Sequence, residues 1–572
     1  MIYVNLGIPE FQLMSLEEPD DADAEGLKKA LENSISKLEL TVDRKDHELG
    51  LCSDGAAVNL SLFEKVKADV GDHYIQTWCP SHRLELAIKD AFTESQLNKS
   101  CEKDLSEVYY LFRKATLRWR LFKRQALFMG LEHRKYKRPS GTRWVEHQAA
   151  NINAYGHNLP ILIGFFDQQI SNPHNASIKK VKSTLEGLRS NICQTERIIF
   201  CGVKEDVLSI VQPLSKVLQE NSLILPALIT CCSKTLKSIK KLDELLERDG
   251  LEALNNAEVF PSTAKLIEKM SEEETGIIPN RQTRKEASGN PDNKYTLFHN
   301  SSYLLKGNMH VALQKVHREI HSIVKNLHDA FKVRLDPIVE DELFQAMAVF
   351  LDTQSYGMMD SDDILESVNM IVSRFNQLLR ANSCNVESLK SEFEILYEHV
   401  TRFLKRKSSE KTWQHLFSCQ IRLGITNILH LAEIAIAMPA SNAETERVFS
   451  FLWRIFSKDR QSFKNKQLEN ILRMRCDRDF SPDRYNHAIE LFLNEHPNGE
   501  IRERRRRVDG HEYPCKRKSR KVEKKSIAMA LDDVISSGEE DIEEDAMENI
   551  RDIDINLISS DEWTDSESDS DF

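Results

Sequence analysis

The sequence predicts an α/β core that is interrupted by a long all-helical segment and followed by a charged C-terminal tail without a fixed fold. Three observations indicate this class. Short strand-like and helical patterns alternate near the N-terminus, helical periodicity dominates from about residue 155 to 435, and the chain becomes polar and charged beyond Pro497. A chain of 572 residues is long enough for several domains, each with its own core.

A β-hairpin is predicted at the N-terminus. Apolar residues alternate with other residues in two short runs, 2–6 and 11–13, and Gly7 and Pro9 lie between the runs. Alternation with a period of two indicates a strand with one buried face, and Gly and Pro indicate a turn. We therefore expect a hairpin over residues 2–13.

The next elements alternate between helix and strand. Leucine and isoleucine recur at helical spacing over residues 24–38, and strands are expected at residues 49–53 and 74–77. A further helix is expected to begin near Ser81. This alternation is typical of an α/β protein.

A large helical segment follows. Residues 155–435 show helical periodicity and no convincing strand, and the polar stretch 279–293 is expected to be a loop. Four more helices are expected towards the C-terminus, at residues 428–438, 441–456, 466–476 and 485–493.

The composition argues against a membrane protein, a secreted protein and a zinc-finger protein. The sequence has no run of roughly eighteen apolar residues, and its N-terminus lacks the pattern of a signal peptide, so neither a membrane span nor secretion is expected. The eleven cysteines include no Cys-x-x-Cys pair, which argues against a zinc finger and a disulfide framework. The expected location is the cytosol or the nucleus.

Four short motifs carry the candidate chemistry, and they become informative together. The motifs are S-D-G-A-A-V-N with Asp54, W-C-P-S-H-R-L-E-L with Cys79 and His82, G-T-R-W with Arg143 and Trp144, and P-A-S-N-A-E-T-E-R-V-F-S with Glu446 and Arg447. Their order and character resemble the hAT superfamily of DNA transposases. The resemblance covers roughly residues 1–495.

The resemblance implies a ribonuclease-H-like core that is interrupted by a helical insertion. It assigns residues 1–150 to the first part of the core, 151–427 to the insertion, and 428–496 to a C-terminal dimerisation region that completes the core. Residues 497–526 then form a basic linker and residues 527–572 an acidic, disordered tail. The core is expected to be N-terminally incomplete.

The resemblance also implies three carboxylates that hold two divalent metal ions for strand cleavage and transfer. Asp54 matches the second carboxylate and Glu446 the third, whereas the first would come from a strand before residue 1. Asp20, Asp21 and Asp23 fall in a polar turn and are not expected to substitute. Two carboxylates lose the geometry that bridges two metals. We expect no strand transfer and no cofactor, with Mg²⁺ expected only if an upstream aspartate exists.

Each motif also has a simpler structural explanation. The Asp-Gly after the strand is often only a turn, and Cys79 and His82 fit a structural Cys and a hydrogen-bonded His better than half of a four-ligand zinc site. Trp144 fits equally a partly buried core residue and the family's aromatic that supports an unstacked base. Glu446 and Arg447 also fit a surface ion pair, but the flanking residues favour the family pattern.

The tail begins with two basic clusters that resemble a bipartite nuclear import signal. The clusters contain Arg504, Arg505, Arg506 and Arg507, followed by Lys516, Arg517 and Lys518. Nuclear localisation is therefore expected. The same cations are expected to contact nucleic acid non-specifically, because they neutralise phosphates.

The acidic end of the tail contains a short aliphatic run, Ile555, Leu557 and Ile558, flanked by acids and serines. This pattern resembles a SUMO-interacting motif, in which apolar residues add a strand to a sheet edge and acids meet a basic rim. The tail is thus expected to bind SUMO or nuclear proteins.

These features lead to three hypotheses. The first is a catalytically inactive, transposase-derived nuclear protein that forms a homodimer or a higher homo-oligomer and binds proteins or nucleic acid. The second is a truncated form of an active hAT transposase, whose missing part carries the first aspartate and a zinc-finger DNA reader. The third is a SUMO-pathway factor, either a reader or an E3 ligase. None of them involves a membrane.

Overall fold

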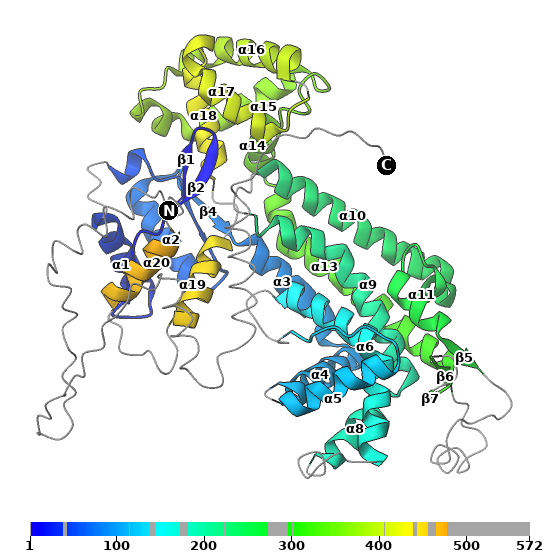
Figure 1. Cartoon of the computed structure of the whole chain (residues 1–572). Coiled ribbons are helices and arrows are strands. Elements are labelled where there is room, and N and C mark those ends of the chain that lie inside the picture. Colours follow the sequence, from blue (N-terminus) through cyan, green and yellow to red (C-terminus); the bar gives the residue numbers. More distant parts are fainter. Residues whose placement is uncertain are drawn as a thin grey trace, which may run out of the picture. The chain divides into compact units, whose positions relative to one another are not determined.

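The protein was analysed as a computed structural model (Figure 1). It describes residues 2–37, 43–113, 115–137, 144–171, 181–220, 225–272, 296–299, 303–404, 406–438, 443–455 and 465–476 of the chain. The loop expected at 279–293, the helix expected at 485–493 and both charged blocks of the tail lie outside these residues. Within them, no helix combines the length and the hydropathy that crossing a lipid bilayer requires.

The predicted N-terminal hairpin is confirmed. Strands β1 (Ile2–Asn5) and β2 (Ile8–Phe11) pair antiparallel through a two-residue turn. Both turn residues, Leu6 and Gly7, have a positive φ, as the tightest hairpin turns require. A Cβ atom at Gly7 would lie 2.7 Å from the Phe417 ring, so the turn also needs glycine for close packing.

A parallel β-α-β unit follows, and its strands lie within one residue of the predicted ranges. Strands β3 (Gly50–Ser53) and β4 (Ile75–Trp78) are parallel and are connected by helix α2 (Ala57–Val70). Helix α1 (Ala24–Ser36) packs on α2, and the short helix η1 (Arg44–Asp46) precedes β3. Among the described strands, β1 and β2 form one sheet, and β3 and β4 form another.

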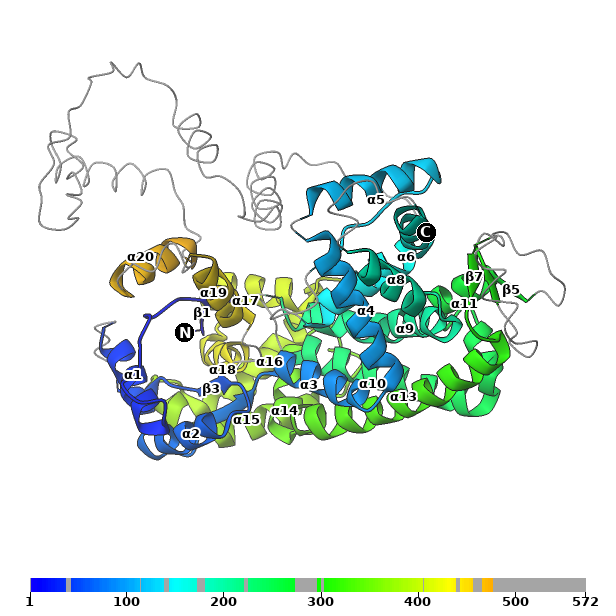
Figure 2. The same cartoon turned by 90° about the horizontal axis from the view of Figure 1, so that it is seen from below.

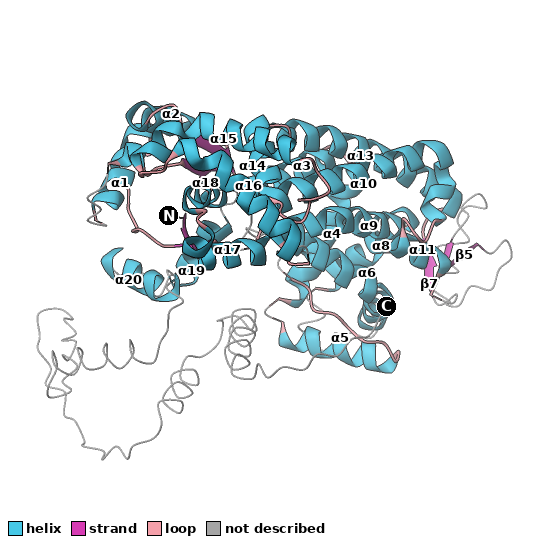
Figure 3. Cartoon of the chain, turned by 90° about the horizontal axis from the view of Figure 1, so that it is seen from above, coloured by secondary structure: helices cyan, strands magenta, loops and turns pink. Residues whose placement is uncertain are grey.

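The remainder of the described chain is mostly helical (Figure 3). The helices up to residue 268 are α3 (Pro80–Thr93), α4 (Gln96–Phe112), α5 (Thr116–Phe128), α6 (Trp144–Ser171), α8 (Lys182–Ile192), α9 (Thr195–Val217), α10 (Leu225–Asp249), η2 (Gly250–Asn255) and α11 (Pro261–Glu268). The later helices are α13 (Met309–Val339), α14 (Glu342–Leu351), α15 (Ser361–Ala381), η3 (Val386–Ser388), α16 (Leu389–His399), η4 (Val400–Leu404), α17 (Ser409–Leu423), α18 (Thr426–Ala437), α19 (Ala443–Ile455) and α20 (Asn465–Cys476).

One apolar core extends through the helical segment and includes strand β4. The same cluster of buried side chains reaches from Ile75 to Met438. The boundary expected between residues 150 and 151 falls inside α6. The helical segment therefore shares its core with the preceding α/β unit, because α3, α4 and α6 contribute apolar residues to it.

The expectation that residues 155–435 contain no strand is wrong. Strands β5 (Met270–Glu272), β6 (Thr296–Phe298) and β7 (Tyr303–Leu305) form a small antiparallel sheet. Each strand has only three residues, and a period of two cannot be recognised over so short a run.

The last three described helices match their predicted ranges to within two residues. Helix α18 is apolar and buried, and it packs beside the hairpin strands β1 and β2 (Figure 1). Helices α19 and α20 share a separate apolar cluster with Leu13 and Leu16, which follow the hairpin (Figure 2). The N-terminal segment and the last helices thus pack against each other.

A buried polar group joins three helices inside the core. The Lys204 side chain of α9 has no solvent-exposed surface. Its Nζ atom donates to the Asn98 Oδ1 atom at 2.8 Å and to the Glu102 Oε1 atom at 3.2 Å, both on α4, and it lies 3.5 Å from the Gln148 Oε1 atom on α6. Removing the buried cation would take a charged donor away from each of these acceptors.

We therefore predict that Lys204→Met lowers the free energy of unfolding by about 3 kcal/mol, because two buried amide oxygens and a carboxylate lose their partner. Urea denaturation followed by circular dichroism measures the change. Lys240→Met, at a lysine whose side chain is 66% exposed, is the matched control and should change stability by less than about 0.5 kcal/mol. Equal stability of the two variants would contradict the structural role of Lys204.

Candidate functional site

The candidate site lies at one edge of the parallel strand pair. Asp54 follows β3 directly and Cys79 follows β4. Because the strands are parallel, their carboxyl ends share an edge, and the Cys79 backbone N–H donates to the Ser53 carbonyl at 2.8 Å. The first two motifs therefore meet at this edge.

The Asp54 side chain is exposed and organises the turn before α2. Its Oδ1 atom accepts hydrogen bonds from the Ala56 backbone N–H at 3.2 Å and from the Asn59 Nδ2 atom at 2.6 Å. This is the turn role that an Asp-Gly sequence favours. Asn59 closes the same motif, but its partnership with Asp54 was not foreseen.

Helix α19 brings Glu446 to the same strands. The Cys52 thiol of β3 is hydrogen-bonded to Cys79, and this bond, burial and the negative charges of Cys79 and Glu446 raise the pKa of Cys52 well above its ordinary value. The partly buried Glu446 carboxylate therefore lies close enough to act on β3.

Arg447 connects α19 to the helical segment. Its guanidinium group forms an ion pair with Glu444 and donates to the Gln219 carbonyl, just after α9. The partner in this ion pair is Glu444, three residues before Arg447 on the same helix. The sequence could not predict the hydrogen bond with the Gln219 carbonyl, because only the tertiary fold brings Gln219 close to Arg447.

Two side chains of the motif around Cys79 contact each other, and the sequence did not predict this contact. The Arg83 guanidinium carbon lies 4.2 Å from the centroid of the Trp78 ring, a distance typical of a cation–π contact. Arg83 also donates to the Arg334 carbonyl at 2.5 Å, and burial together with the Arg334 charge lowers the pKa of Arg83. His82 lies half-buried in the first turn of α3.

The remaining predicted site residues are placed only in part. Trp144 is the first residue of α6, but its side chain lies outside the described residues, as do Arg143 and the predicted import and SUMO-binding residues. Asp20 pairs with Lys29, and Asp23 accepts from the Gly26 N–H at the start of α1. These acids lie at a helix start, as expected from the sequence.

The described residues do not fit a two-metal centre. Nowhere in the described ranges do three or more His, Cys, Asp or Glu side chains gather in a way that could hold a metal ion. One oxygen of Asp54 is already engaged in two turn hydrogen bonds.

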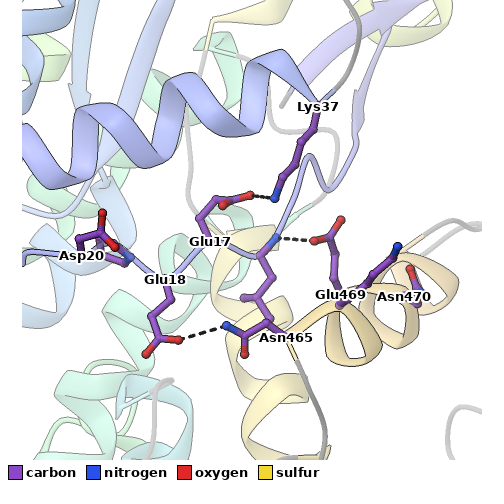
Figure 4. A pocket seen from close by; sticks show the side chains of 10 residues that line it. Glu17, Glu18, Asp20, Lys37, Asn465, Glu469 and Asn470 are labelled. Atoms are coloured by element: carbon purple, nitrogen blue, oxygen red, sulfur yellow. Dashed lines mark hydrogen bonds and ion pairs between the residues drawn. The ribbon is translucent and has the colours of Figure 1, made fainter.

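An open hollow of about 780 Å³ lies elsewhere, between the segment that follows the hairpin and α20 (Figure 4). Its acidic side chains form an ion pair and hydrogen bonds with other residues of the chain. Glu17 pairs with Lys37, Glu18 accepts from Asn465 at 3.1 Å, and Glu469 accepts from the Leu16 N–H at 3.5 Å. These bonds fasten the N-terminal segment to α20.

No protein-family model matches the sequence.

We predict different effects of two substitutions at Asp54. Asp54→Ala removes both hydrogen bonds to Oδ1 and should lower the free energy of unfolding by about 1 kcal/mol. Asp54→Asn keeps an oxygen acceptor and should lower it by less than about 0.5 kcal/mol. Urea denaturation measures both values. An equal loss in the two variants would show that the negative charge, and not the turn, is what matters at this position.

Proposed function

We propose that the protein is a non-catalytic, hAT-transposase-derived scaffold that self-associates and acts in the nucleus by binding proteins or nucleic acid. The observation that carries this proposal is that the Asp54 and Cys79 motifs meet at one strand edge, while α19, which holds the Glu446 motif, packs with α20 against the segment that follows the hairpin. The motif residues are thus used for turns and packing. In this proposal, their role is structural.

The arrangement of the strands is consistent with this proposal. A hairpin and a parallel β-α-β unit occur in that order, and they form separate sheets among the described residues. In the proposed ribonuclease-H-like core, these two pairs would flank a central strand. Helices α19 and α20 would complete the core, which agrees with their packing against Leu13 and Leu16.

Within the expected dimerisation region 428–496, the proposed self-association uses α19 rather than α18. The helix predicted at 428–438 was expected to take part in it, but the apolar side chains of α18 are buried within the chain's own core. Helix α18 cannot offer them to a second copy without unfolding. Helix α19 does expose an aromatic side chain, since Phe449 is 51% exposed.

Light scattering of the full chain at micromolar concentration tests this proposal. We expect a mass at least twice the 65.9 kDa of one chain, and we expect Phe449→Glu to shift the protein towards the monomer, because it places a charge in an apolar contact. Phe403→Glu on η4 alters an equally apolar, 72% exposed residue and should leave the mass unchanged. A monomeric wild type would refute self-association.

A further inference from the structure

Basic residues are concentrated in one segment of a chain that is acidic as a whole. Residues 113–143 contain eleven Lys and Arg side chains and a single acid, whereas the net charge of the chain is -12. The segment includes α5 and the extended stretch that follows it, and it ends just before α6. Such a concentration of one sign raises the local density of counter-ions and of anionic partners.

Helix α5 presents part of this charge on an exposed face. Its residues Leu121 and Phe122 are buried, whereas Arg120, Lys123 and Arg124 are exposed. Positions i, i+3 and i+4 share one face of a helix. None of these three cations forms an ion pair within the described part of the chain. In Figures 2 and 3, α5 lies beside α6 on the side away from α13.

The extended stretch 131–137 continues the basic surface because its backbone is fixed to α6. The backbone N–H groups of Arg134 and Lys137 donate to the Asn158 and Asn151 side chains at 2.9 and 2.6 Å. Asn158 also donates to the Arg134 carbonyl at 2.7 Å. The backbone hydrogen bonds are thus satisfied, while the side chains of Arg134 and Lys137 remain exposed.

The two parts of the surface lie close together. The His133 ring contacts the Trp119 ring of α5 edge-on, with 5.5 Å between the ring centroids. Burial and the positive charges of Lys123 and Lys135 lower the pKa of His133. Cations from α5 and from the extended stretch therefore act on the same imidazole.

The side chains around the cations favour nucleic acid over other anions. Phe128 is 86% exposed and Leu127 is 81% exposed at the end of α5. Guanidinium groups bind phosphates through two parallel hydrogen bonds, and both guanidinium groups and aromatic rings stack on bases. A partner made only of carboxylates would use the charge but not the exposed aromatic ring.

We propose that α5 and residues 131–137 form a surface that binds the phosphate backbone of a nucleic acid, with Arg120, Lys123 and Arg124 as its principal contacts. This surface is independent of the basic linker in the tail. It is also separate from self-association, and it rests on the proposed function, whose nucleic-acid binding it assigns to a surface.

Fluorescence anisotropy with the full chain tests the proposal, using a labelled DNA duplex and a single strand of the same sequence over a range of salt concentrations. The variant Arg120→Glu/Lys123→Glu/Arg124→Glu reverses the charge of the exposed face. The control Lys234→Glu/Lys237→Glu/Lys241→Glu makes the same change of net charge at exposed positions of α10. Circular dichroism and light scattering on both variants show whether folding and self-association are retained.

We expect the α5 variant to lose at least about tenfold in affinity for one or both DNA forms, and its slope of log affinity against log salt to fall by about 3. The α10 control should keep the wild-type slope. Equal effects of the two variants would overturn the proposal. It would also be overturned if the α5 variant lost binding to a labelled peptide of residues 527–572 but kept its affinity for DNA, since the surface would then serve the chain's own acidic tail.

Discussion

The packing of α3 along α13 fixes the position of the strand edge relative to the helical segment. Helix α3 begins with Pro80, immediately after β4 and Cys79, so its placement also places the edge. Arg83 donates to the Arg334 carbonyl, and Asp90 forms an ion pair with the Arg334 side chain. Helices α9, α10 and α14 pack on α13 as well. Helix α13 therefore both positions the strand edge, through α3, and lies at the centre of the helical core.

The elements with a local pattern could be predicted from the sequence, and those defined by distant contacts could not. The hairpin, the two parallel strands and helices α18 to α20 lie within two residues of their expected ranges, because each shows a period of two or of 3.6 residues. The sheet of β5, β6 and β7 escaped prediction because its strands are too short. The common core of β4 and the helices depends on long-range packing, which periodicity does not report.

The candidate site was predictable as a set of residues but not as a set of contacts. Asp54, Cys79 and Glu446 belong to motifs that can be read along the chain, and the first two lie at one strand edge. The hydrogen bonds of Asp54 to Ala56 and Asn59 hold the turn before α2. Arg447 contacts a carbonyl more than two hundred residues away in the sequence, and no local pattern encodes such a contact.

The central claim is that α19 closes onto strand β3, and the alkylation of Cys52 tests it most directly. The rate is followed against pH by mass spectrometry of the Cys52 peptide in the full chain. The hydrogen bond with Cys79 and burial raise the pKa of Cys52 most, and the Glu446 charge adds to them, so Glu446→Gln should shift the midpoint of the profile to lower pH, whereas Glu398→Gln on α16 should not. An unchanged midpoint in Glu446→Gln would contradict the closure of the core by α19.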